Sequence, residues 1–232
     1  MTLAARLSAI DEQIADAARL AGRDAGELTR IVVTKFHPAS LVADLAALGV
    51  TDVGENRQQE LTAKRGALRQ AQEPDELANV RWHFIGQAQT NKAAAIRRSS
   101  DAVHSVDRDR LADALHRAAD SDAVLDVLVQ ITLTQDAGRG GVPPEGAVGL
   151  ADHIAGLPSL RLRGVMAVAP LEEEPASAFA RLWSVADAVR AQHPDASWIS
   201  AGMTADFAQA IEAGATHLRI GSAITGPRPV RG

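Results

Sequence analysis

Residues 197–226 read SWISAGMTADFAQAIEAGATHLRIGSAITG and place two short apolar strands, 197–200 and 216–221, on either side of an alanine-rich segment. Six more strands are predicted before them, at 30–35, 52–55, 80–86, 101–106, 124–133 and 160–168. The segments between strands follow the ~3.6-residue helical period, and parallel neighbouring strands need such crossovers. Eight strand–helix units therefore predict an α/β fold, a (β/α)8 TIM barrel. A doubly wound open sheet is the alternative, because counting strands does not show closure.

The domain organisation is predicted to be simple, with residues 1–232 forming one barrel domain. No low-complexity linker or duplicated repeat interrupts the chain, and the most irregular segment is the Gly- and Pro-rich loop at 134–146. Apolar residues recur at helical spacing from Leu3 to Ala21, which predicts an extra N-terminal helix. Asp11 and Glu12 interrupt that segment, so it does not resemble a secretory signal.

Composition narrows the classes of function. The 232 residues include no Cys, which excludes disulfides, thiolate metal sites and thiol nucleophiles, and no Tyr, which excludes a phenolic general base. The formal charge of −5 disfavours a nucleic-acid partner, which needs a clustered basic face. No apolar run approaches the ~20 residues needed to span a bilayer. We expect a soluble cytoplasmic protein with no nucleic-acid or membrane partner.

A lysine closes the first predicted strand. Active sites of such barrels lie at the C-terminal strand ends, and Lys35 is the last residue of RIVVTK. Desolvation there would favour a neutral, nucleophilic amine able to form a Schiff base. The alternative is a lysine that extends to solvent at the rim.

The next strand ends give weaker indications. Asn56 follows the second strand, where it could contact a ligand or cap the following helix. His83 lies near the end of the third strand and on its own is better explained as a packed core residue than as a catalyst. Histidines are not paired at metal-binding spacing, and Glu172 to Glu174 read as a solvated loop, so no metal site is predicted.

The last two strands predict a phosphate site. Ser200 ends the seventh strand, and Arg219, Gly221 and Ser222 lie at the end of the eighth. Loops after these strands, with a helix N-terminus, form the usual phosphate site of TIM barrels. The alternative is that Gly221 and Ser222 only cap a helix. A rim lysine together with a phosphate site suggests a phosphorylated aldehyde, with pyridoxal 5′-phosphate (PLP) first and a phosphosugar aldolase substrate as the alternative.

Longer motifs carry a family resemblance from about Arg30 to Gly226. VVTKFHP, GENRQQE, WHFIGQAQTNK, HSVDR, LRGVMAV and the stretch at 199–226 occur in order. Together they resemble the PLP homeostasis protein family (YggS/PROSC), which is similar to the barrel domain of alanine racemase, PLP fold type III, without the second domain. The resemblance implies a monomer that takes part in PLP homeostasis.

The resemblance also implies roles for individual residues. It makes Lys35 the residue that carries PLP as a Schiff base, and it places Asn56 near the cofactor ring. It assigns the phosphate to Ser200, Gly221 and Ser222, and the pyridine nitrogen to Arg219. His83 and Met166 would line the pocket. The sequence departs from the common family pattern at His37, Arg57, Thr132, Arg139 and Ala201.

The missing tyrosine separates a carrier from an enzyme. An arginine beside the pyridine nitrogen disfavours the pyridinium, and a neutral ring is a weaker electron sink. Racemisation in the related barrels also uses a second base, a tyrosine from the domain this chain lacks. We therefore expect a PLP-binding protein without efficient catalysis, with apo PLP enzymes as recipients of the cofactor. The alternative is a weak amino-acid racemase in which His83 or His37 is the second base.

Overall fold

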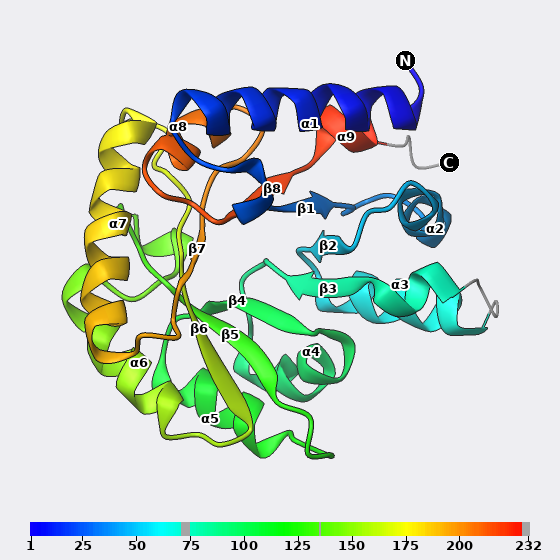
Figure 1. The fold of residues 1–232 in the computed structure, drawn as a ribbon. Coiled ribbons are helices and arrows are strands. Elements are labelled where there is room, and N and C mark those ends of the chain that lie inside the picture. Colours follow the sequence, from blue (N-terminus) through cyan, green and yellow to red (C-terminus); the bar gives the residue numbers. More distant parts are fainter. Residues whose placement is uncertain (71–74, 135, 229–232) are drawn as a thin grey trace.

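The computed structural model describes residues 1–70, 75–134 and 136–228 and contains a closed barrel of eight parallel strands (Figure 1). The strands are β1 (Thr29–Val33), β2 (Asp52–Glu55), β3 (Arg81–Phe84), β4 (Ala102–Val106), β5 (Leu125–Gln130), β6 (Leu160–Met166), β7 (Trp198–Ser200) and β8 (His217–Ile220). Strand β1 pairs in parallel with both β2 and β8, so the sheet closes on itself. Closure confirms the barrel prediction and excludes the doubly wound alternative.

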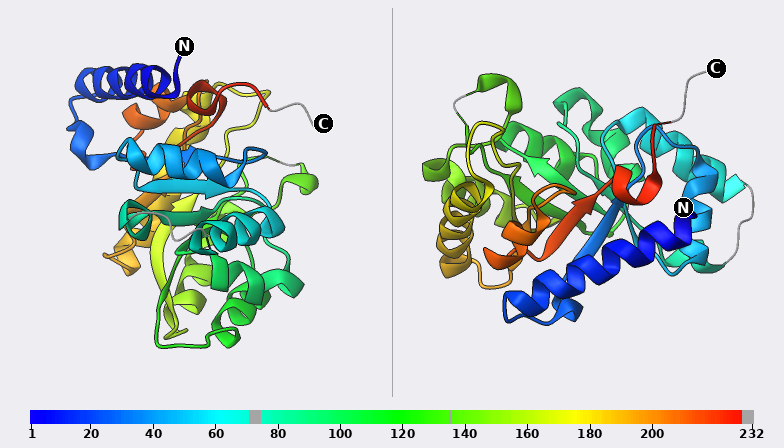
Figure 2. Two further views of the ribbon diagram at one scale, coloured as in Figure 1. Left: turned by 90° about the vertical axis from the view of Figure 1, so that its right-hand side faces the viewer. Right: turned by 90° about the horizontal axis from the view of Figure 1, so that it is seen from above.

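Helices surround the barrel, as the two views in Figure 2 show. They are α1 (Leu3–Leu20), α2 (Ala39–Ala47), α3 (Gln58–Gln70), α4 (Ala93–Ser99), α5 (Asp109–Arg117), α6 (Ala147–Ala155), α7 (Pro175–Gln192), α8 (Phe207–Glu212) and α9 (Ser222–Thr225). Short 3₁₀ helices occur at Ala25–Glu27, Asp75–Asn79, Thr90–Lys92, Ala137–Arg139 and Pro144–Gly146. The last two lie in the predicted loop at 134–146, of which residue 135 is outside the described residues. Within the described ranges, no helix combines the length and apolar character needed to cross a membrane.

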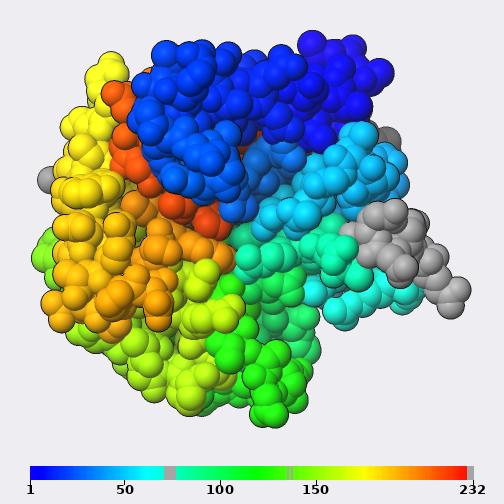
Figure 3. All heavy atoms as spheres, in the orientation of Figure 1, coloured from blue at the N-terminus to red at the C-terminus, as the bar shows by residue number. Residues whose placement is uncertain are grey.

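The predicted N-terminal helix exists and closes one side of the barrel. Helix α1 buries Leu7, Ile10, Ile14 and Ala18 along one face and packs against α8 and α9. These residues recur at three- and four-residue intervals, which is the spacing of one face of a helix. Arg6 on the same helix donates from Nε to the carbonyl oxygen of Ile224 at 2.6 Å. In the space-filling view, α1 covers the upper edge of the molecule as one continuous ridge (Figure 3).

Strand β1 ends two residues earlier than predicted. The chain leaves the sheet after Val33 and turns, with the amide of His37 donating to the carbonyl of Thr34 at 3.1 Å. Phe36 adopts a left-handed backbone conformation, φ 72°, which is uncommon for a residue other than glycine. Lys35 therefore sits in a strained turn above the barrel instead of closing a strand.

The barrel interior is unusually polar. Such interiors are normally filled with branched apolar side chains. Here His83, His104, Ser200, His217 and Arg219 are all buried on the strands. A hydrogen-bond contact joins His104 of β4 to Ser200 of β7, and these strands are not neighbours, so the contact crosses the inside of the barrel.

Candidate functional site

A cavity of about 450 Å³ opens at the C-terminal end of the barrel. This volume is within the usual range of small-molecule sites. Five residues predicted from sequence line it together: Lys35, Asn56, Arg219, Gly221 and Ser222. The structure therefore brings together most of the predicted site from the ends of β1, β2 and β8, and β8 is a neighbour of β1 only because the barrel closes.

The lining of this cavity is cationic. Lys35, Arg219 and Arg228 line it, and its described lining residues include neither Asp nor Glu. Positive groups without carboxylates in a recess raise the local concentration of anions. The remaining lining residues are apolar or neutral, among them Ile85 and Val168. The cavity is thus suited to a small anionic molecule with an apolar body.

Arg219 forms the buried part of this cavity. Its side chain donates from Nη1 to Ser200 Oγ at 2.7 Å and from Nη2 to the Ala167 carbonyl at 2.8 Å. Burial lowers the pKa of Arg219 to about 10, while Asp206 acts in the opposite direction. The guanidinium therefore remains charged at neutral pH and is held in one plane.

The end of β8 offers backbone donors to an anion. Gly221 precedes α9, and its carbonyl accepts from the amides of Ile224 and Thr225. The amides at the start of the helix have no partner within the helix, so they are free for a bound anion. A Cβ on Gly221 would meet only Val33, at 3.7 Å, so the protein itself leaves this space open. Ser222 adds a hydroxyl at the same rim.

The turn that carries Lys35 is clamped by an ionic cluster that sequence reasoning missed. Lys64 of α3, only 5% exposed, donates to the Thr34 carbonyl at 2.8 Å and to Glu55 Oε1 at 2.6 Å. Its Nζ also lies 3.0 Å from Glu60 Oε1, which accepts from the Phe36 amide. The backbone is thus held on both sides of Lys35. We call Glu55, Glu60 and Lys64 the clamp.

Burial in the clamp has an electrostatic cost. Desolvation raises the pKa of the Glu55 carboxyl, and the charge of Lys64 opposes that rise. Glu55 Oε1 also accepts from Thr34 Oγ1 at 2.6 Å. The sequence carried one signal for this cluster, the i,i+4 spacing of Glu60 and Lys64, but that spacing is common on exposed helix faces.

Three cationic side chains lie close to the ring of Phe36 beside the cavity. The Arg228 guanidinium carbon lies 3.7 Å from the centre of its ring, and that of Arg57 lies at 5.5 Å. Lys35 Nζ is 5.9 Å from the same ring. Cations within about 6 Å of an aromatic face are attracted by its electron density. Phe36 therefore helps to keep several positive groups at one edge of the cavity.

Asn56 is placed by a close backbone contact. A Cβ on Gly86 would lie 1.9 Å from the Asn56 carbonyl oxygen, so only glycine permits this approach. Gly86 follows β3 in the motif WHFIG, and Asn56 follows β2. The glycine of the motif thus fixes how Asn56 enters the cavity.

Three predicted positions lie elsewhere. Ser200, His83 and Met166 are buried and are not among the residues that line the cavity. Ser200 instead contacts Arg219 and His104, and its predicted contact with the phosphate stays a prediction. His83 is fully buried, with one ring nitrogen 2.8 Å from His104 and the other 2.8 Å from Asp52. The expectation that His83 lines the pocket is wrong because its side chain points into the barrel interior.

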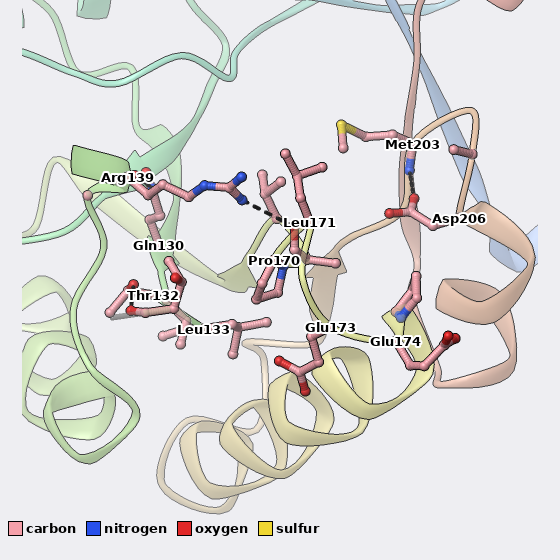
Figure 4. Close-up of a pocket in the computed structure, with 17 residues that line it drawn as sticks. Gln130, Thr132, Leu133, Arg139, Pro170, Leu171, Glu173, Glu174, Met203 and Asp206 are labelled. Atoms are coloured by element: carbon pink, nitrogen blue, oxygen red, sulfur yellow. Dashed lines mark hydrogen bonds between the residues drawn. The ribbon is translucent and has the colours of Figure 1, made fainter. Parts of the chain in front are cut away.

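A second cavity, of about 610 Å³, adjoins the first and shares Val168, Met203 and Ala205 with it. Figure 4 shows its lining, with Arg139 opposite Met203 and Asp206. Arg139 donates to the carbonyl of Ala169 at 3.3 Å. Glu173, Glu174 and Asp206 also line it, so this cavity carries both signs of charge. It therefore lacks the uniform positive charge of the first cavity.

His37 is the one histidine lining the first cavity in the described part of the chain. Burial and the nearby charge of Lys64 lower its pKa, so the imidazole is neutral at neutral pH. A neutral imidazole can accept a proton.

Comparison with known proteins places the chain in a family. The family model described as the alanine racemase N-terminal domain matches residues 6–229. The pyridoxal phosphate homeostasis protein of Mycobacterium bovis is 40% identical over 238 residues, covering 97% of this chain and 92% of the relative. The chain belongs to the pyridoxal phosphate homeostasis protein family.

Solved structures agree with this membership. PipY of Synechococcus elongatus, solved with PLP bound, is 29% identical with a TM-score of 0.81, covering 96% of this chain and 99% of PipY. Alanine racemase of Corynebacterium glutamicum is 18% identical with a TM-score of 0.67, covering 97% of this chain and 62% of the racemase. The second likeness shows the shared barrel fold.

Of the five positions that the resemblance marks as departures from the family pattern, four lie at or beside the two cavities. His37 lines the first cavity, and Arg57 lies over the adjoining Phe36 ring. Thr132 and Arg139 line the second cavity. Ala201 is buried.

Proposed function

We propose that this chain is a PLP-binding protein of intracellular PLP homeostasis that holds the cofactor covalently on Lys35, without efficient catalysis. The observation that carries this proposal is the first cavity. It combines one primary amine, a fixed guanidinium and free helix amides, and its described lining contains no carboxylate. This donor set fits PLP, which when bound supplies an electrophilic aldehyde carbon and an anionic phosphate. Membership of the family supports PLP over a phosphosugar aldolase substrate.

Each lining group has a proposed task. Lys35 supplies the amine, and the clamp keeps its turn in place. Gly221 and Ser222 bind the phosphate through amide and hydroxyl donors. Arg219 faces the ring nitrogen, where its charge disfavours protonation. Asn56 orients the ring from the end of β2.

The same residues argue against efficient turnover. A racemase needs a base on each face of its substrate, and the sequence contains no tyrosine. The first cavity offers no carboxylate among its described lining residues. A weak racemase with His37 as the second base is the alternative, favoured by the neutral His37 imidazole at the cavity. His83 cannot take that role because it is buried with both ring nitrogens occupied.

Borohydride trapping tests the covalent site with little ambiguity, because the sequence has only three lysines, Lys35, Lys64 and Lys92. Purified protein is incubated with PLP, reduced, digested and mapped by mass spectrometry. We expect the cofactor mass on the Lys35 peptide and its loss in Lys35→Ala, with trapping retained in the matched control Lys92→Ala. Trapping on another lysine, or none in the unaltered protein, would overturn the proposal.

Chirality measurements separate the carrier from the weak racemase. The PLP-loaded protein is incubated with L- and D-alanine and compared with free PLP. We expect no racemisation above that of free PLP. Turnover well above that level which disappears in His37→Ala would establish the enzyme instead.

The recipients and the assembly state complete the proposal. We propose that apo PLP enzymes in the cytoplasm take PLP from a monomeric carrier. Loaded protein is mixed with an apo PLP-dependent aminotransferase, either in one compartment or across a dialysis membrane. Faster reactivation in one compartment supports direct transfer, and equal rates contradict it. Light scattering coupled to size exclusion tests the monomer.

A further inference from the structure

A continuous chain of polar contacts runs through the barrel beneath the cofactor cavity. Arg219 Nη1 lies 2.7 Å from Ser200 Oγ, and Ser200 Oγ lies 2.9 Å from His104 Nδ1. His104 Nε2 is 2.8 Å from His83 Nδ1, and His83 Nε2 is 2.8 Å from Asp52 Oδ1. The five residues come from β8, β7, β4, β3 and β2 and are all buried. We call them the relay.

One arrangement of protons satisfies every contact of the relay with a single proton on each imidazole. In this arrangement Ser200 Oγ accepts from Arg219, which can only donate, and gives its own proton to His104 Nδ1. His104 then carries its proton on Nε2 and donates to His83 Nδ1. His83 in turn carries its proton on Nε2 and donates to the Asp52 carboxylate. Every contact is thereby satisfied in one direction, from a cation to an anion.

The surroundings of the relay favour this assignment. Desolvation holds the pKa of His104 well below its usual range, so that imidazole is neutral. Burial alone would raise the pKa of Asp52, but hydrogen bonds from His83 and Thr51 and nearby positive charge together outweigh burial and lower that pKa, so the carboxyl is ionised. Asp52 Oδ2 also accepts from Thr51 Oγ1 at 2.8 Å. His217 lies outside the relay, with its Nδ1 2.8 Å from Thr216 Oγ1.

A buried polar chain of this length requires a reason. Polar groups inside a protein are costly unless all are paired, and an apolar interior would be simpler. The relay and the Ala167 carbonyl together take two N–H groups of Arg219, which fixes the plane of its guanidinium. Of the five relay residues, only Arg219 lines the cavity.

We propose that Asp52, His83, His104 and Ser200 are positioning residues that hold the Arg219 guanidinium in a single orientation toward the ring nitrogen of PLP. This inference rests on the proposed function for its cofactor, but the relay itself can be tested without PLP. A relay of fixed direction keeps the guanidinium from rotating away from the ring.

Histidine ¹⁵N NMR on the protein without PLP tests the proton positions. We expect His83 and His104 to be neutral and protonated at Nε2, with signals assigned by their loss in His83→Asn and His104→Asn. In Ser200→Ala, the His104 Nδ1 signal should shift because its donor is removed. A charged imidazole, or a proton on Nδ1 of either residue, would overturn the relay.

Ser200→Ala then tests the effect on the cofactor against a matched control, Ser105→Ala. Ser105 lies beside His104 on β4 and is buried, and its hydroxyl has no hydrogen-bond partner among the described residues. We expect Ser200→Ala to weaken PLP binding roughly tenfold and to shift the ¹⁵N signal of labelled PLP at its ring nitrogen. Ser105→Ala should do neither, and Ser200→Thr, which keeps the hydroxyl, should restore both.

The outcomes separate the two proposals. Equal behaviour of Ser200→Ala and Ser105→Ala overturns the positioning role while leaving the proposed function intact. Failure of the unaltered protein to bind PLP overturns the proposed function and the cofactor role of the relay, and the histidine spectra still judge its proton positions. If Ser200→Ala does not fold, Asp52→Asn replaces it, because it keeps the acceptor and removes the charge. A smaller shift of the ring-nitrogen signal in the same direction supports the role, and no shift contradicts it.

Discussion

Lys35, in the turn after β1, and Arg219, on the neighbouring strand β8, line the same cavity, yet the protein supports them in different ways. The clamp holds the backbone on both sides of Lys35 from helix α3, outside the barrel. The relay holds the guanidinium of Arg219 itself, from inside the barrel. Among the described residues no hydrogen bond of Lys35 Nζ is found, whereas Arg219 has two N–H groups occupied.

This difference matches the proposed tasks of the two residues. A reversible carrier needs an amine that can form and release a covalent bond, so its side chain must move while its base stays in place. A charge that sets the protonation of the cofactor ring must instead keep its position. Backbone support suits the first task, and support of the side-chain head suits the second.

The largest effect is expected from a substitution that breaks the clamp. Lys64→Met leaves Glu55 buried without its cation, and the loss of one partner of a buried ion pair costs about 3–5 kcal/mol. Urea unfolding at neutral pH measures the loss. The control Lys92→Met should change stability by less than about 0.5 kcal/mol. The double variant Glu55→Gln with Lys64→Met should recover most of the loss; a deficit as large as in the single variant would show that Glu55 is not the cause.

The pH dependence of stability tests the barrel interior, from which Arg219 is held. Burial lowers the pKa of His217 to about 3, against about 6.5 in an unfolded chain. The unfolded chain therefore binds a proton between these values when the folded protein does not, so stability falls on acidification. Between pH 7 and pH 5 His217 should account for a loss of about 2 kcal/mol. His217→Asn should reduce the slope measured by urea unfolding, and an unchanged slope would contradict this account.

Removal of the Arg219 guanidinium is expected to have a smaller effect, on the affinity for PLP. Arg219→Gln should weaken PLP affinity about tenfold, equivalent to about 1.4 kcal/mol, because the charge facing the ring is lost. Lys35 should still be trapped by borohydride at saturating PLP, since its support is separate. Fluorescence titration measures the affinity, with Arg161→Gln at a largely exposed position as the control. Loss of trapping at saturation would mean that the two supports are not independent.

The smallest change tests how the clamp holds its turn. Glu60→Gln keeps an oxygen for the Phe36 amide but removes one charge beside Lys64. Because Lys64 retains Glu55, the cost should be below about 1 kcal/mol. Thermal unfolding and PLP titration should both stay near those of the unaltered protein. A large loss of PLP affinity would show that the charge of Glu60, and not its hydrogen bond, holds the turn.

The barrel was predictable because each strand is a short apolar run between helical segments. All eight predicted strands are present, and most of their ends lie within one or two residues of the predicted ones. The N-terminal helix was predictable from the spacing of Leu7, Ile10 and Ile14. The early end of β1 was not, because a left-handed turn at Phe36 is dictated by contacts with α3 and not by local propensity. One domain over residues 1–232 stays a prediction.

Most residues of the site could be predicted from the positions of the strand ends, but how deeply each side chain lies inside the barrel could not. Lys35, Asn56, Arg219, Gly221 and Ser222 meet as expected because the C-terminal ends of parallel strands share one face. Ser200 and His83 lie deeper, and only the register of neighbouring strands shows this: Ser200 pairs with His217, two residues before Arg219. The relay also escaped prediction, because it joins residues of strands far apart in sequence. The clamp escaped prediction because its short segment acts on a turn about thirty positions earlier, which the sequence does not indicate.

The contact between α1 and α9 has a practical consequence for anyone handling the protein. Arg6 donates to the carbonyl of Ile224, which lies within the short helix that begins at Ser222. The first turns of the chain thus serve as a brace for the end of the pocket assigned to the phosphate. Trimming or crowding the first few residues is therefore expected to loosen a binding site more than two hundred positions away in sequence.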